Sequence, residues 1–98
     1  MWILETAGDA EEKFTFRVPA GAVKTIGRAT GAEFIVDAPL VSRLHCQLTA
    51  TGTTLQVKDL DSTNGTFVNG ARMQTAQLRE GDTLSVGRVD LIVSKRTI

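Results

Sequence analysis

The sequence predicts an all-β protein, an antiparallel sandwich or barrel of about nine to eleven short strands. Apolar residues repeat with a period of two over short runs, as they do in half-buried strands. Turn-forming sequences recur about every ten residues between these runs. Only one segment, residues 71–79, has even a weak helical pattern. Many short strands joined by regular turns are typical of this class.

The expected strands are of two kinds. Alternating strands carry apolar side chains on one face, whereas continuous apolar runs are typical of strands buried on both faces. The alternating segments are residues 14–18, 23–26, 55–58 and 84–86. The continuous runs are residues 34–36 and 91–93.

Short sequences rich in glycine, asparagine and aspartate separate these strands. They are Pro19-Ala20-Gly21, Thr30-Gly31, Thr51-Gly52, Asn64-Gly65, Asn69-Gly70 and Glu80-Gly81-Asp82. Residues 71–79 lie between the last two turns and place their apolar side chains loosely on one helical face. Because so short a segment without a cap is a marginal helix, we expect loop and strand there.

Composition excludes several classes of function. The chain has 11 basic and 11 acidic residues, so its balanced charge argues against binding duplex DNA or an anionic membrane surface. One Cys and one His are too few for a disulfide framework or a structural zinc site, and we expect neither metal nor cofactor. We expect a single domain over residues 1–98 and a monomer. We also expect a cytoplasmic location (nuclear if the source is eukaryotic), because the amino terminus lacks the pattern of a signal peptide.

Polar residues gather in three segments that follow or precede expected strands. They are Gly27-Arg28, Ser42-Arg43-Leu44-His45 and Asp61-Ser62-Thr63-Asn64-Gly65-Thr66. Arginine is a permanently charged, planar donor, and hydroxyl and amide groups add donors without a countercharge. This combination is suited to holding a phosphate group.

These three motifs are followed by Phe67-Val68-Asn69-Gly70, Gly81-Asp82 and Gly87, and in this order and spacing the chain resembles a forkhead-associated (FHA) domain over essentially its whole length. The resemblance implies a two-sheet β-sandwich of about eleven strands, with a peptide lying across loops at one end. It also implies a module without enzymatic activity that binds a phosphothreonine-containing protein, the product of a Ser/Thr kinase.

The resemblance assigns phosphopeptide binding to Arg28, Ser42, Arg43, Thr63 and Asn64. Arg28 and Ser42 would bond the phosphate, and Thr63 would contact the phosphate or the ligand. Asn64 would bond the peptide backbone, although it also fits the left-handed position of an Asn-Gly turn. Arg43 would supply a second charge to the phosphate or to an acidic residue of the peptide.

The Ser-x-x-His sequence also permits a hydrolase, in which Ser42 is the nucleophile, His45 its base and Asp59 or Asp61 the third member of a triad. Residues three apart on a strand point to opposite faces, so the pair could meet only across a sharp turn. The resemblance implies instead a structural histidine that holds the Ser42 loop in shape. The residues expected to support the site are Gly27, His45, Gly65 and Asn69.

Two alternatives to phosphothreonine recognition therefore stay open. An interaction or scaffold module could use a sheet face or edge of the same fold without phosphate, and Arg28→Ala would then leave partner binding intact. In a hydrolase, Ser42→Ala would abolish ester hydrolysis.

Overall fold

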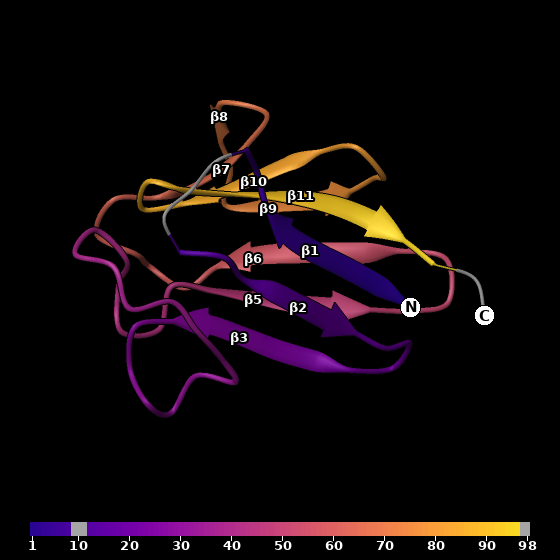
Figure 1. The fold of residues 1–98 in the computed structure, drawn as a ribbon, viewed down its shortest axis with the longest axis horizontal. Coiled ribbons are helices and arrows are strands. Elements are labelled where there is room, and N and C mark those ends of the chain that lie inside the picture. The colour runs from indigo at the N-terminus through magenta and orange to yellow at the C-terminus, as the bar shows by residue number, and fades with distance from the viewer. Residues whose placement is uncertain (9–11, 97–98) are drawn as a thin grey trace.

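The computed structural model describes residues 1–8 and 12–96, and within them eleven β-strands form two sheets (Figure 1). In chain order the strands are β1 (Trp2–Thr6), β2 (Thr15–Val18), β3 (Val23–Gly27), β4 (Phe34–Ile35), β5 (Cys46–Ala50), β6 (Leu55–Asp59), β7 (Thr66–Val68), β8 (Ala71–Arg72), β9 (Thr75–Leu78), β10 (Thr83–Val86) and β11 (Val89–Lys95). Across this described part of the chain, no helix is present that could span a membrane. The segment 71–79 contains β8 and β9, so the expectation of loop and strand is confirmed.

The strand order is β2-β1-β11-β10-β7-β8 in one sheet and β4-β3-β5-β6-β9 in the other. The predicted two-sheet β-sandwich is confirmed, with one correction to its antiparallel character. β3 and β4 run parallel, with Ile26 beside Phe34. After β3 ends at Gly27, residues 28–33 form a loop that returns Phe34 to a position beside Ile26. β4 therefore runs in the same direction as β3.

Apolar side chains from both sheets fill the space between the layers. Leu4 and Leu91 of one sheet and Leu48 of the other are fully buried. At one side of the sandwich, Phe16 of β2 stacks on Phe34 of β4 with ring centroids 4.5 Å apart. Each buried leucine contributes about 1.5–3 kcal/mol, so this core fixes the register of the strands.

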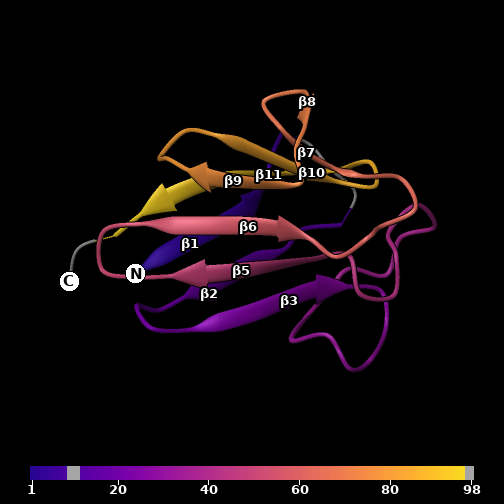
Figure 2. The same ribbon diagram turned by 180° about the vertical axis from the view of Figure 1, so that it is seen from behind.

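The register brings three chain segments to one end of the sandwich. Cys46, the first residue of β5, pairs with Ile26 near the end of β3 and with Asp59 at the end of β6. The segments 28–33, 36–45 and 60–65 therefore start or finish side by side, at the left of Figure 1 and the right of Figure 2. The amino terminus lies at the opposite end of the molecule.

Candidate functional site

Four of the five residues predicted to bind phosphopeptide line one small pocket at the end where the three segments meet. This tip pocket has a volume of about 140 Å³ and is lined by Arg28, Pro39, Leu40, Val41, Ser42, Thr63 and Asn64. Each of the three polar motifs contributes at least one side chain to it. The convergence that the prediction required is therefore present.

Arg28 is an exposed side chain anchored at one point. Its Nε donates a hydrogen bond of 3.1 Å to the carbonyl of Val41, and its backbone amide donates to the carbonyl of Ser42 at 2.9 Å. Because the guanidinium has five N–H donors, the terminal Nη1 and Nη2 groups stay available to a ligand. Because the anchor is a backbone carbonyl and not a carboxylate, it orients the Arg28 side chain without neutralising its charge.

Ser42 and Asn64 tie the segments to one another. The Ser42 Oγ accepts a hydrogen bond of 2.9 Å from the backbone amide of Thr63, which leaves the hydroxyl proton for another acceptor. The Asn64 Nδ2 donates to the carbonyl of Leu40 at 3.0 Å. Each of these bonds joins residues more than twenty positions apart.

The proposed left-handed conformation of Asn64 is wrong. Among the described non-glycine residues, positive φ occurs at Asp61 and Asn69, whereas in the Asn64-Gly65 pair only Gly65 has it, with φ of 91°. Glycine tolerates this conformation without a steric cost, so Asn64 keeps ordinary backbone geometry and its amide reaches across to the neighbouring segment.

His45 is fully buried and uses both ring nitrogens to hold backbone groups. Its Nδ1 accepts a hydrogen bond of 3.1 Å from the Ser42 amide, and its Nε2 lies 2.8 Å from the Gly65 carbonyl, to which it must donate. With neither nitrogen free, the ring does not act as a general base on the Ser42 hydroxyl. Burial also raises the pKa of the adjacent Cys46 thiol to about 12, so a thiolate nucleophile is absent at neutral pH.

A buried hydrogen-bond network that sequence reasoning missed supports the 60–65 segment. The Asp59 Oδ1 accepts hydrogen bonds from the hydroxyls of Ser62 at 2.5 Å and Thr66 at 2.7 Å, and the Ser62 Oγ accepts from the Gly65 amide at 2.9 Å. Burial alone would raise the pKa of Asp59, but these hydroxyls and the Ser62 amide together hold it below its ordinary value of 3.8. A carboxylate at the buried position after Leu55 and Val57 was the available signal.

Gly27 allows the Ser42 motif to pack directly on β3. A Cβ at this position would lie 2.1 Å from the backbone oxygen of Arg43, which is too close for any other residue. Asn69 supports a more distant turn: its Nδ2 donates to Asp82 at 3.0 Å and its Oδ1 accepts from the Thr83 amide at 2.9 Å. The hydrogen bond from Asn69 is also the main reason that the pKa of Asp82 is lowered.

Arg43, the fifth predicted binding residue, does not line the tip pocket. It lines an adjacent pocket of about 400 Å³, here called the Arg43 pocket, with Arg28, Ala29, Thr30 and Asp37. Arg28 belongs to both pockets. The side chains of Ser42 and Arg43, although neighbours in the sequence, thus line different pockets.

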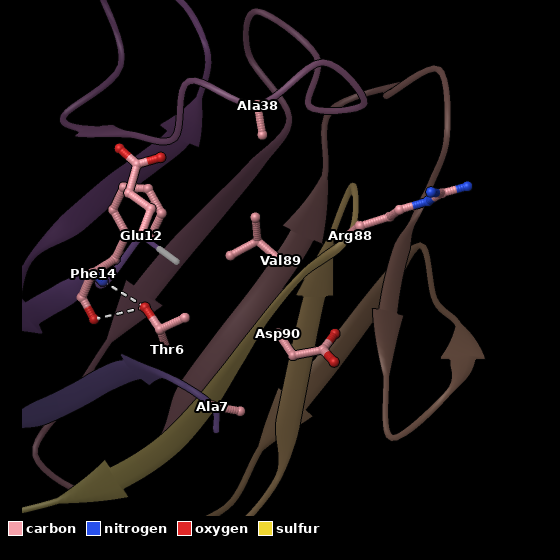
Figure 3. Close-up of a pocket in the computed structure, with 8 residues that line it drawn as sticks. All are labelled: Thr6, Ala7, Glu12, Phe14, Ala38, Arg88, Val89 and Asp90. Carbon is pink, nitrogen blue, oxygen red and sulfur yellow. Dashed lines mark hydrogen bonds between the residues drawn. The ribbon is translucent and has the colours of Figure 1, made fainter. Parts of the chain in front are cut away.

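A further pocket of about 230 Å³ lies between the end of β1 and the start of β11 (Figure 3). Glu12 and Asp90 line it, and Figure 3 shows the Arg88 side chain extending away from them. Two carboxylates make this pocket a poor site for an anion. In the described residues, no three His, Cys, Asp or Glu side chains gather as a metal site would require.

Comparisons with known proteins agree with this geometry. Residues 24–87, which include all five predicted binding residues, match the FHA domain family. The ABC transporter ATP-binding/permease protein Rv1747 of Mycobacterium tuberculosis is 40% identical over 86 residues, which cover 88% of this chain but only 10% of that protein. The FhaA FHA domain, solved in complex with the intracellular domain of Rv3910, has a TM-score of 0.86 and 34% identity over 96% of this chain and 100% of that one. An FHA domain studied for its phosphothreonine-dependent interactions has a TM-score of 0.84 and 32% identity over 99% of this chain and 98% of that one.

Proposed function

The chain belongs to the FHA domain family, and from this premise we propose that it binds phosphothreonine in a protein phosphorylated by a Ser/Thr kinase. The observation that carries the proposal is the tip pocket, in which side chains from three distant segments surround one small space. We further propose that the binding residues are Arg28, Ser42, Thr63 and Asn64, with Arg43 beside them.

In this proposal the phosphate enters the tip pocket as a group of about −1.5 to −2 charge. Arg28 bonds it through Nη1 and Nη2, since its Nε is held by Val41. Ser42 donates its hydroxyl proton, since its oxygen already accepts from the Thr63 amide. The remaining amide donor of Asn64 bonds the peptide backbone.

The expected affinity follows from these contacts. Charge-assisted hydrogen bonds contribute about 1.5–3 kcal/mol each, and ordering a flexible peptide offsets a large part of their sum. Three or four such bonds give micromolar binding, about −8 kcal/mol. Such an affinity suits a reversible signal that a phosphatase can end.

Threonine is the expected phosphorylated residue. Leu40 and Val41 line the tip pocket beside the polar donors, so the extra methyl group of threonine has apolar neighbours there. Burying one methyl group is worth about 0.8 kcal/mol, which is enough for a severalfold preference over phosphoserine.

The proposal includes no catalysis and places the protein in the cytoplasm, where Ser/Thr kinases and their substrates meet. Support for a non-catalytic role comes from His45, whose two ring nitrogens are occupied by backbone groups. The chain spans 10% and 18% of the length of the first two curated relatives, Rv1747 and FhaA, so the activity of any longer protein that contains it is a separate question.

Three matched peptides test the proposal: one with phosphothreonine, one with phosphoserine and one unphosphorylated. We expect saturable, micromolar shifts of backbone amide NMR signals with the phosphothreonine peptide, confined to residues 27–28, 42–45 and 63–65. Identical responses to all three peptides would reject phosphate recognition and favour a phosphate-independent interaction module.

A further inference from the structure

The turn between β10 and β11 packs directly on the segment that lines one side of the tip pocket. Gly87 lies in this turn and has φ of 60°. A Cβ at Gly87 would lie 2.9 Å from Val41 Cγ2, 3.1 Å from the Leu40 carbonyl carbon and 3.2 Å from the Val41 amide nitrogen. The last two atoms form the peptide bond between Leu40 and Val41. That peptide group therefore rests against Gly87, and an added side chain would have to displace it.

The same short segment orients two of the proposed binding residues. The Leu40 carbonyl accepts the hydrogen bond of 3.0 Å from Asn64 Nδ2, and the Val41 carbonyl accepts that of 3.1 Å from Arg28 Nε. Because the two acceptors are consecutive in the chain, one displacement of residues 40–41 would misdirect both donors.

The close contact at Gly87 is not a by-product of its turn geometry. Among the described glycines with positive φ, an added Cβ would meet nothing within 4 Å at Gly8, Gly21, Gly70 and Gly81. At Gly65 it would meet the long side chain of Arg72. In this set, Gly87 alone would bring a Cβ against the backbone of another segment. Position 87 thus requires glycine both for its φ and for its missing side chain.

From these contacts, and resting on the proposed function, we propose that Gly87 is a positioning residue for phosphopeptide binding. It lies outside the lining of the tip pocket and acts without touching the ligand. Because it has no side chain, the β10–β11 turn supports the Leu40–Val41 peptide group at the place where the two carbonyls hold Arg28 and Asn64. The donors of both residues are then fixed before the peptide arrives, which lowers the entropy cost of binding.

Gly87→Ala tests this role, with Gly81→Ala as its matched control. Both glycines have positive φ in turns that flank β10, so both substitutions strain the backbone, but only the one at position 87 meets residues 40–41. Calorimetric titration with a phosphothreonine peptide measures affinity, and denaturant unfolding shows that each chain is folded. We expect Gly87→Ala to bind about tenfold more weakly, as for the loss of one charge-assisted hydrogen bond, and Gly81→Ala to bind within about twofold of the wild type.

A second readout separates positioning from a general loss of stability. In the free chain, the NMR signals of the Arg28 Nε–H and of the Asn64 side-chain amide report the two hydrogen bonds directly. Both signals should shift in Gly87→Ala and stay in place in Gly81→Ala. Unshifted signals in Gly87→Ala, or equal losses of affinity in the two variants, would overturn the proposal.

Val41→Ala provides a rescue, because it removes the closest contact of the added Cβ and leaves the two backbone contacts. The double variant should bind more tightly than Gly87→Ala and more weakly than Val41→Ala, and the second comparison stands even if Gly87→Ala does not fold. Equal affinities of the double variant and Val41→Ala would contradict displacement of the backbone as the cause.

The outcomes also separate this inference from the proposed function. If the wild type binds phosphorylated and unphosphorylated peptides equally, the proposed function fails and this inference fails with it. If the wild type prefers the phosphothreonine peptide and Gly87→Ala binds it as well as Gly81→Ala does, only the role of Gly87 is overturned.

Discussion

The two ends of the sandwich are built by different kinds of contact. At the end that carries the amino terminus, each turn closes over three residues: the Ala22 amide donates to Pro19, and the Thr54 amide donates to the Thr51 hydroxyl. The long-range bonds there, such as the Gly21 amide to the Ala50 carbonyl and Trp2 Nε1 to the Thr51 carbonyl, are made to turns that are already closed by these local bonds. At the loop end, hydrogen bonds join residues twenty or more apart, as between His45 and Gly65. A local turn can form whenever its own residues allow it. The tip pocket exists only when the sandwich around it has folded.

Because of this difference, losing a hydrogen bond at the loop end costs more free energy of unfolding. The same bonds also fix the positions of the binding donors. Groups such as the Gly65 carbonyl have no local partner, and an unsatisfied buried polar group costs about 1–3 kcal/mol. His45 supplies a partner to the Gly65 carbonyl, and Ser42 supplies one to the Thr63 amide, each from twenty or more positions away. Asp59 adds bonds to the nearby Ser62 and Thr66 hydroxyls. Their polar contacts hold the binding donors in place before a ligand arrives, which lowers the entropy cost of binding.

The largest expected effect is that of His45→Ala. It removes two hydrogen bonds to buried backbone and leaves a cavity, so the free energy of unfolding should fall by about 3 kcal/mol or more. Thr51→Ala, at the opposite end, removes local bonds of an exposed turn and should cost about 1 kcal/mol or less. Denaturant unfolding measures both. Equal losses for the two variants would show that the ends do not differ in this way.

Arg28→Gln should affect binding without affecting folding. The charge and the terminal donors are lost, so phosphothreonine peptide should bind at least about tenfold more weakly, while the free energy of unfolding changes by less than about 0.5 kcal/mol. Calorimetry and denaturant unfolding give the two quantities. Arg17→Gln, which removes an exposed arginine of β2 that lines none of these pockets, is the matched control and should bind normally; a similar loss there would mean that only overall charge matters.

Gly27→Ala tests the close packing of the Ser42 motif on β3. The added methyl group would meet the Arg43 carbonyl, a backbone atom that must move, and we expect a destabilisation of about 1–3 kcal/mol together with weaker peptide binding. Gly31→Ala has open space at its Cβ and an unremarkable φ, so it should be nearly neutral. If both variants unfold at the same denaturant concentration, the close approach is not a constraint.

The fall in the free energy of unfolding at acid pH tests one carboxylate from each end of the sandwich. Asp59 and Asp82 both have pKa values lowered below 3.8 in the folded chain, so the unfolded chain binds more protons in this range. The stability they contribute is fully present above about pH 4 and is lost as pH falls through the folded pKa. We expect Asp59→Asn and Asp82→Asn each to flatten this loss in unfolding experiments. A wild type whose stability rises on acidification would contradict the sign.

The sequence predicts most strands because one face of each is buried. Residues 55–58 alternate, and β6 follows that pattern to Asp59. β1, β5 and β7 are additional to the expected strands; in β1, Trp2, Ile3 and Leu4 are all buried and show no alternation. The parallel course of β4 depends on how a distant segment returns to β3, and no local pattern encodes it.

The candidate site, like the fold, could be predicted from the sequence only in part. Its residue types and their order in three motifs indicate a phosphate-binding module, and the resemblance supplies their convergence. The separate pocket of Arg43 could not be predicted, because side-chain direction in an irregular segment depends on tertiary packing. The role of Asp59 was hidden for the same reason, since its partners are Ser62 in the loop that follows β6 and Thr66 at the start of β7.

The most direct test of a pre-arranged phosphate pocket is a crystal structure of the chain with a phosphothreonine peptide. We predict phosphate oxygens within hydrogen-bond distance of the Arg28 guanidinium and the Ser42 hydroxyl, with the His45 to Gly65 and Asn64 to Leu40 hydrogen bonds unbroken. A phosphate bound elsewhere on the molecule, or bound only after these hydrogen bonds have broken, would contradict the account.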